Sequence, residues 1–192
     1  MLNINAVTKL ARDNFRYNEG AFYGSAVGLA LGVGLIYSSV RHPLYNERTR
    51  LFATVEGVVN VLTHECDIDA ENDRLFNDYV LICPIIPFDT FAHQFVEVQP
   101  ESTLNALIPA LAGDKIFRAL YIPPIGDELP FGGILYLNTI CSTHRTLFAA
   151  GHAQPLCALS LYAQQILDRK IENHCKRCRH PTLTGLAVGI YA

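Results

Sequence analysis

The chain has 192 residues, of which 50% are hydrophobic and 17% are charged, and its formal net charge at pH 7 is -3. This length suits one well-cored domain with an appendage, and the low charged fraction requires an extensive core or a lipid-facing segment. The negative balance excludes attraction of nucleic acid by a positive field over the whole surface, so any such role needs a local basic patch.

Six cysteines are spread along the chain, and the first sixteen residues include the charged side chains Lys9, Arg12, Asp13 and Arg16. A disulfide scaffold would be smaller and denser in cysteine, and a secretory signal would contain an uncharged apolar stretch. We therefore expect reduced thiols and a cytoplasmic protein. Membrane association is an alternative that depends on an apolar segment near the start of the chain.

The first fifty residues predict a short amphipathic helix over 1–20, followed by the apolar segment 21–40, which has no charged side chain. Gly24, Gly28 and Gly32 recur at every fourth position, as in helices that pack closely in lipid. The same segment fits a buried Gly-rich helix or a pair of core strands. Basic residues on both sides leave a membrane orientation undetermined.

From about residue 51, short apolar runs alternate with turn residues, which predicts an antiparallel β domain. An acidic loop separates the first two strands, and Pro84 and Pro87 should end the second strand or place it at a sheet edge. A short helix and a longer amphipathic helix should pack on this domain. The expected strands are 55–63, 79–86, 116–122 and 134–140, and the expected helices are 102–111 and 156–173.

Three segments carry a family resemblance: 59–63 (Val-Asn-Val-Leu-Thr), 81–86 (Leu-Ile-Cys-Pro-Ile-Ile) and 140–145 (Ile-Cys-Ser-Thr-His-Arg). Their order and the closing helix resemble the small SH3-like barrel of the MazF/PemK family, over roughly residues 55–172. That family has a Val-Pro-Ile-Thr strand end and a later Ile-Arg-Thr-Val-Asp-Arg segment. This chain departs from the pattern, with Ile86 in place of the threonine and with Cys141 and His144 in place of the arginine and aspartate.

The resemblance implies a mainly β fold with α-helices, in which an SH3-like antiparallel barrel carries a C-terminal helix and an N-terminal helical and apolar extension. The corresponding division is an extension over 1–50, a barrel with its closing helix over 51–173, and a Cys/His/basic segment with an apolar tail over 174–192. Family members are toxins that cleave single-stranded RNA without a metal cofactor and often dimerise. The resemblance therefore implies single-stranded RNA as substrate, an antitoxin-like protein partner and a homodimer.

The loop that begins at Thr63 gathers chemically capable side chains directly after an apolar strand, where function is often concentrated. His64 and Cys66 share a direction if the strand continues, so they fit a metal site or a thiolate–imidazole pair, with Asp67 orienting the histidine. The alternative is that Cys66 is a small core residue and that Asp67 is a turn residue. Arg74, in the same loop, is either an anion contact or a solvated side chain.

The later segment adds His144 as an acid or base and Arg145 as the group that stabilises a pentacoordinate phosphate. The alternative is an ordinary polar strand end before a helix. The candidate catalytic residues are His64, Asp67, Arg74, His144 and Arg145, and the candidate substrate contacts are Thr63, Arg118, Lys176 and Arg177.

Residues 174–180 contain a Cys-x-x-Cys pair flanked by histidines, which supplies enough donors for a tetrahedral zinc site. The second pair of a zinc ribbon is missing, and cations at a helix end are also explained by the helix dipole. The candidate metal ligands are Cys66, His174, Cys175, Cys178 and His180.

Three functions remain as hypotheses from the sequence. The first is a MazF/PemK-like toxin or RNA-interacting protein, with metal-independent endoribonuclease activity at an altered site. The second is a non-catalytic protein-interaction module, attached to a membrane through 21–40 if that segment is a transmembrane helix. The third is a small zinc-binding protein.

Overall fold

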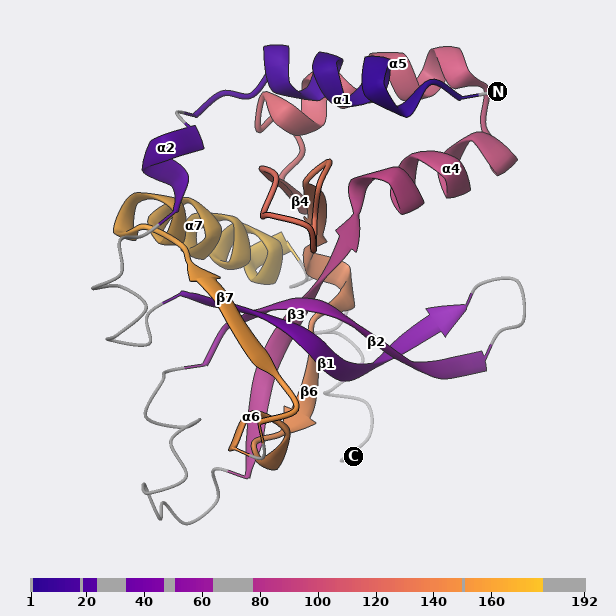
Figure 1. Ribbon diagram of the computed structural model, residues 1–192. Helices are drawn as coiled ribbons and strands as arrows, with labels where there is room; N and C mark the ends of the chain where they lie inside the picture. Colours follow the sequence, from indigo (N-terminus) through magenta and orange to yellow (C-terminus); the bar gives the residue numbers. More distant parts are fainter. Residues whose placement is uncertain are drawn as a thin grey trace, which may run out of the picture.

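The computed structural model describes residues 2–17, 19–23, 34–46, 51–63, 78–149 and 151–177. Strands form the middle of the molecule, and helices lie around them (Figure 1). In chain order the elements are α1 (Ile4–Asp13), α2 (Glu19–Phe22), β1 (Leu35–Asn46), β2 (Leu51–Val61), β3 (Tyr79–Pro87), α4 (Phe88–Val98), α5 (Glu101–Ala112), β4 (Ala119–Ile122), β5 (Gly133–Tyr136), a 3-10 turn (Leu137–Thr139), β6 (Cys141–His144), α6 (Thr146–Ala149), β7 (Gln154–Ala158) and α7 (Leu161–Arg177).

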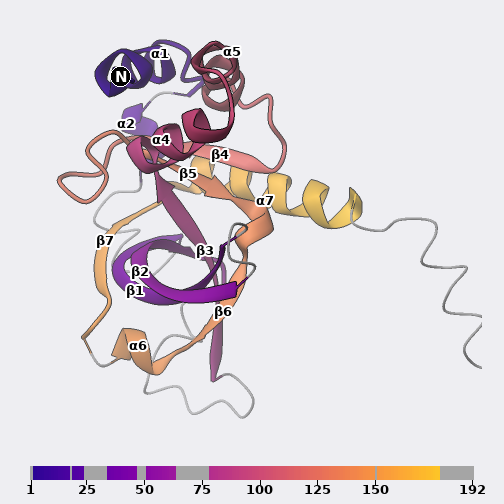
Figure 2. The ribbon, with the colours of Figure 1, turned by 90° about the vertical axis from the view of Figure 1, so that its right-hand side faces the viewer.

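The strands form a seven-stranded sheet in the order β4-β5-β3-β2-β1-β7, and β6 pairs with β3 outside this path. Each pairing between neighbouring strands is antiparallel. Figure 2 shows how strongly the β1–β2 hairpin curves around the lower part of the sheet. The expectation of a mainly antiparallel β fold with α-helices is confirmed.

β3 holds the sheet together, because three strands pair with it. β2 lies along one edge, whereas on the other edge β6 pairs with 79–82 and β5 pairs with 85–87. Pro84 lies between these two stretches, where neither β5 nor β6 is opposite it. A residue without an N–H group is therefore tolerated in a central strand. The prediction that Pro84 ends the strand or marks a sheet edge is wrong, whereas Pro87 does end β3.

Buried side chains form three clusters that correspond to three layers of packing. The first lies between the sheet and α7, and the second between β4, β5 and the helices α1, α4 and α5 (Figure 1). The third is surrounded by β1, β2, β3, β6 and α6. Fully buried members are Leu135 in the first cluster, Leu104 in the second and Ile82 in the third. Burial of each such side chain contributes about 1.5–3 kcal/mol to folding.

The N-terminal helix α1 is shorter than predicted, since it ends at Asp13 rather than near residue 20. Its start is fixed by Asn3, whose side-chain oxygen accepts a hydrogen bond from the Ala6 N–H at 3.2 Å, as an N-cap residue does. Val7 and Ala11 lie on the face that packs against α4 and α5.

The apolar segment 21–40 does not continue as a helix, because residues 35–40 belong to β1. Ile36 pairs with Asn60 of β2, and its side chain is fully buried. A helix spanning the whole segment, as an anchor or a core helix, is therefore wrong for residues 35–40, and residues 24–33 lie outside the described residues. None of the described helices is long and apolar enough to cross a membrane. The division expected at residue 50 falls between two paired strands.

The remaining predicted elements differ mainly at their ends. The strands 55–63 and 79–86 and the helix 102–111 are confirmed as β2, β3 and α5. β4 is shorter than the predicted strand, and the strand 134–140 stops at Tyr136 before a 3-10 turn. The helix 156–173 begins only at Leu161, because the residues before it form β7 beside β1.

Candidate functional site

Both described ends of the predicted catalytic loop lie at one end of the sheet. The Leu62 N–H donates to the Leu81 carbonyl at 2.9 Å, so β2 finishes beside the start of β3. The Arg145 N–H donates to the Asp78 carbonyl at 2.9 Å, so the end of β6 lies there too. We call this region the β3–β6 end, and it comprises Thr63, Asp78, Tyr79, Leu81, His144, Arg145 and Thr146.

Much of the predicted loop cannot be placed within this region. His64, Cys66, Asp67 and Arg74 lie outside the described residues. Thr63 is the last described residue before them, and its hydroxyl oxygen is buried without a hydrogen-bond partner among the described residues. The structure therefore brings together Thr63, His144 and Arg145 from the predicted site.

His144 is held by its neighbours in a defined orientation. Its ring meets the Tyr79 ring edge to face, with centroids 5.5 Å apart and an interplanar angle of 80°. Its Nδ1 lies 2.9 Å from the Thr146 hydroxyl, and the Thr146 N–H donates to the same Nδ1 at 3.4 Å. An Nδ1 that accepts these hydrogen bonds assigns the neutral-ring proton to Nε2. His144 therefore presents a hydrogen-bond donor to a ligand.

Arg145 adds a cation at the same place. Its Nε lies 3.8 Å from the Asp78 Oδ1. The Arg145 side chain is 18% exposed, whereas the Asp78 side chain is 61% exposed. The guanidinium is thus oriented by the protein, and the more exposed carboxylate is the partner that a phosphate would displace.

Two large side chains of β3 are exposed at this end. Tyr79 is 66% exposed and Leu81 is 47% exposed. Alternation along the strand puts them on the same face as Cys83, which is buried in the cluster beneath α7. His144 lies opposite Tyr79 in the β3–β6 ladder. The uncovered part of this sheet face is therefore an aromatic and apolar surface bordered by His144 and Arg145.

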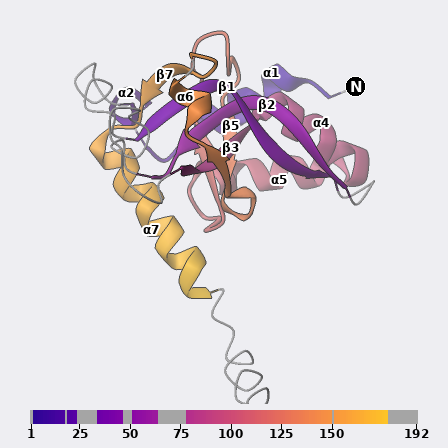
Figure 3. The ribbon, with the colours of Figure 1, turned by 90° about the horizontal axis from the view of Figure 1, so that it is seen from below.

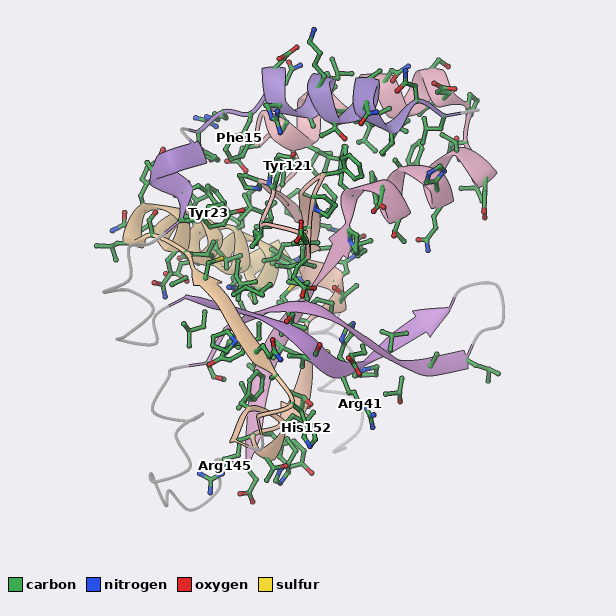
Figure 4. All side chains as sticks on the ribbon, viewed as in Figure 1. Phe15, Tyr23, Arg41, Tyr121, Arg145 and His152 are labelled. Atoms are coloured by element: carbon green, nitrogen blue, oxygen red, sulfur yellow. The ribbon has the colours of Figure 1, made fainter. Side chains whose placement is uncertain are left out.

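Further nitrogen-bearing side chains lie at the same end of the molecule. Figure 4 shows Arg41, His152 and Arg145 near α6, at the lower end of the view. Arg41 comes from β1 and its Nε lies 3.8 Å from Glu56 Oε2, with both side chains mostly exposed. An exposed pair of this kind contributes little to stability, so Arg41 is available to a polyanion.

The other predicted substrate contacts lie elsewhere. Arg118 precedes β4, where its guanidinium lies 5.0 Å from the centroid of the Phe117 ring. Lys176 and Arg177 are in the last turn of α7, which extends past the sheet in Figure 3. Lys176 pairs with Glu172, and this hydrogen bond lowers the pKa of the Glu172 carboxyl. These residues therefore belong to parts of the fold other than the strands of the β3–β6 end.

A metal site is not visible in the described part of the chain, where no three histidine, cysteine or acidic side chains gather closely enough to hold an ion. His174 and Cys175 lie on α7, with Cys175 exposed and the His174 Nδ1 buried without a hydrogen-bond partner among the described residues. Cys178 and His180 lie outside the described residues, as does Cys66. The zinc hypothesis stays a prediction.

The buried thiols are poor nucleophiles. Burial raises the pKa of Cys83 to about 12 and that of Cys157 to about 11, and it also raises the pKa of Cys141. Since the thiolate is the reactive form, these three thiols are neutral at physiological pH, with Cys83 buried and Cys141 and Cys157 partly buried.

The raised pKa of Cys83 predicts a loss of stability in alkali. The thiol ionises near pH 9 in the unfolded chain and near pH 12 in the folded protein, so stability falls as pH rises between these values. The fall from this group should reach about 2 kcal/mol by pH 10.5. Urea unfolding from pH 8 to 10.5 measures it, and Cys83→Ala should show a shallower decline than the unsubstituted protein. Equal slopes would contradict the assignment.

A partly buried charge cluster around Asp114 was not predicted from the sequence. The ammonium of Lys170 on α7 pairs with the carboxylate of Asp114 and donates to the Ile116 carbonyl at 2.8 Å. The same carboxylate accepts a hydrogen bond from the Tyr17 hydroxyl and lies 3.8 Å from Arg16. Burial, with the hydrogen bond to Asp114, raises the pKa of Tyr17 well above its usual range. The cluster fastens the N-terminal segment to the loop after α5 and to α7.

Comparison with known proteins found no relative of this chain. No family model, curated protein or solved structure matches the chain. The fold and the site together define a mixed α/β protein, built on a seven-stranded antiparallel sheet, with an exposed aromatic–histidine pair at one end.

Proposed function

We propose that this protein binds single-stranded RNA at the β3–β6 end, as a small-barrel protein of the MazF/PemK type. The observation that carries the proposal is the exposed Tyr79–His144 ring pair beside Arg145. Aromatic rings on a strand surface stack with unpaired bases, whereas guanidinium and imidazole N–H groups bind the phosphates. Arg41 and His152 are further hydrogen-bond donors in the lower part of the molecule in Figure 4.

The arrangement around the third core cluster supports the barrel part of the proposal. β1, β2, β3 and β6 follow one another around this cluster. The Thr143 hydroxyl of β6 donates to the Arg41 carbonyl of β1 at 3.3 Å, which brings the fourth strand back to the first. A small sheet that returns on itself in this way agrees with the proposed SH3-like barrel.

The orientation of His144 supports binding more directly than cleavage. With its neutral-ring proton on Nε2, the ring donates to a phosphate or base but does not remove a proton from a 2'-hydroxyl. A general base for endoribonuclease activity would come from His64 or Asp67. Cleavage by metal-independent transfer to the 2'-hydroxyl is thus the part of the proposal that depends on His64 and Asp67, which lie outside the described residues.

The test is the affinity for a fluorescently labelled, mixed-sequence single-stranded RNA, measured by anisotropy at several salt concentrations. Tyr79→Ala should weaken binding about tenfold, because one stacked base contributes about 1–3 kcal/mol. His144→Ala should also weaken binding. Tyr162→Ala is the matched control, since Tyr162 is 50% exposed on α7 and should leave affinity unchanged. Absence of RNA binding, or an equal loss with Tyr162→Ala, would reject the proposal.

The same protein, incubated with RNA in the presence of a chelator, tests the cleavage hypothesis separately. Cleavage that resists the chelator and is lost in a His64→Ala, Asp67→Ala variant would establish a nuclease. Intact RNA together with retained binding would establish a binding protein.

A second candidate function, a protein-interaction surface, is favoured by the exposure of Leu81 beside Tyr79. Leu81→Lys distinguishes the two functions, because an added cation should strengthen RNA binding but would place an unpaired charge in an apolar protein interface. Stronger RNA binding by this variant supports the first function.

A further inference from the structure

The outer edge of β2 is unpaired over much of its length within the part of the chain that the structure describes. β3 pairs only with residues 59–61 of β2, so residues 51–58 pair with β1 alone among the described residues. Figure 1 shows this half of the hairpin projecting from the sheet below α4. A two-stranded ribbon is marginally stable in water, so a projecting hairpin with a free edge favours a further strand.

The two edges of the projecting hairpin differ in how they are protected. β1 carries Arg41 and Pro43, and its register is interrupted near Ser39, which has a φ of 57°. Proline, basic residues and irregularities are the features that keep an edge strand from pairing. Residues 51–57 of β2 contain no proline and no basic residue, and Leu51 is 66% exposed. The β2 edge is therefore open to pairing.

Pro43 shows which backbone groups of β2 point outward. It lies opposite Thr54, and since proline has no N–H, this position must be a non-hydrogen-bonded pair of the β1–β2 ladder. The N–H and carbonyl of Thr54 therefore face away from β1. By alternation, the same holds for the backbone groups of residues 52 and 56.

We infer that this edge pairs with the same edge of a second copy of the chain, antiparallel and about a two-fold axis at Thr54. This register lets the outward groups of 52, 54 and 56 bond to those of 56, 54 and 52 in the other copy. It also places Ala53 opposite Val55, and Leu51 opposite Gly57, which has no side chain to obstruct it.

The charges along this edge favour the register with the two-fold axis at Thr54. Glu56 is the only charged side chain among residues 51–57, and it is paired with Arg41 of its own hairpin. With the axis at Thr54, the two Glu56 side chains lie about 14 Å apart along the strands, whereas an axis at Glu56 would set like charges face to face. A second copy in this register therefore presents matching backbone groups without placing like charges opposite each other. This inference is independent of RNA binding.

Cysteine crosslinking of the full chain tests the register. In the proposed pairing the two Thr54 Cα atoms lie about 5.5 Å apart, which is within disulfide range. Thr54→Cys should form a covalent dimer under mild oxidation, whereas the matched Glu56→Cys variant should stay at the background set by the native cysteines. Equal crosslinking of the two variants, or none with Thr54→Cys, would overturn the inference.

The oligomeric state gives an independent measurement. The unsubstituted protein should have the mass of a dimer by light scattering, and Thr54→Lys should have the mass of a monomer with an unchanged circular dichroism spectrum. Thr54 is exposed and its outward N–H is not used by the hairpin, so this substitution leaves the fold intact. An unsubstituted protein that is monomeric at about 100 μM, or a dimer that persists in Thr54→Lys, would refute the pairing.

Discussion

Asp114→Asn should destabilise the protein by about 3 kcal/mol, the lower end of the usual effect of breaking a buried ion pair, because the Asp114 side chain is 16% exposed. The Lys170 side chain is only 7% exposed. After the substitution, its ammonium would keep the Ile116 carbonyl as a hydrogen-bond acceptor. Asparagine keeps the shape of the side chain and tolerates the positive φ of 59° at this position, so the change isolates the lost charge. Guanidinium unfolding curves measure the difference in free energy.

Lys170→Met is the informative companion substitution. In the Asp114→Asn, Lys170→Met double variant no charge is left buried, so much of the stability should return. Glu172→Gln, which breaks an exposed pair on the same helix, is the matched control and should leave the unfolding midpoint unchanged. A double variant as unstable as Asp114→Asn would show that the cluster contributes something other than charge pairing.

Gly132→Ala should be similarly damaging, with a loss of about 3–5 kcal/mol. Gly132 has a φ of 78°, and a Cβ there would overlap the Ile122 carbonyl oxygen and lie 2.9 Å from the Tyr121 hydroxyl. Its backbone is also fixed, because its carbonyl accepts the Phe88 N–H at 3.0 Å. The substitution therefore strains the junction between β3, α4 and the β4–β5 pair. Thermal unfolding followed by circular dichroism measures the loss.

Gly126→Ala separates backbone strain from the steric overlap. Gly126 also has a positive φ, of 48°, but a Cβ there meets nothing within 4 Å. This change should reduce stability by only about 1 kcal/mol, the penalty for a left-handed backbone alone. A comparable loss at both glycines would mean that crowding around Tyr121 is relieved by small shifts.

The β domain was predictable because its strands have clear apolar runs bounded by turn residues, as β2 and β3 show. α4 was missed although Phe88, Phe91, Ala92 and Phe95 recur at helical spacing, because proline-rich surroundings suggested a strand end. The start of β1 was ambiguous because it falls in the uncharged segment 21–40, and β7 was missed because part of it was assigned to the helix 156–173. A fully apolar run fits a helix or a strand, and their pairing joins residues more than a hundred positions apart.

The candidate site was only partly predictable. His144 and Arg145 stood out as reactive side chains at a strand end, and the structure places both at the β3–β6 end. Tyr79 did not stand out, because its exposure depends on how far α7 covers the sheet. The pairing of Asp114 with Lys170 was invisible for a similar reason, since neither residue has a local pattern that distinguishes it from a surface charge.

The charge cluster also sets an order for events during synthesis. Tyr17 bonds to Asp114, which lies 97 positions later in the chain, and Asp114 in turn needs Lys170 of α7. Ser160, at the start of α7, donates to the carbonyl of Ala21 across 139 positions. Such distant contacts form late and slow folding. While a ribosome is still translating the last helix, the N-terminal segment therefore has no final docking place, and a chaperone that holds it has time to act.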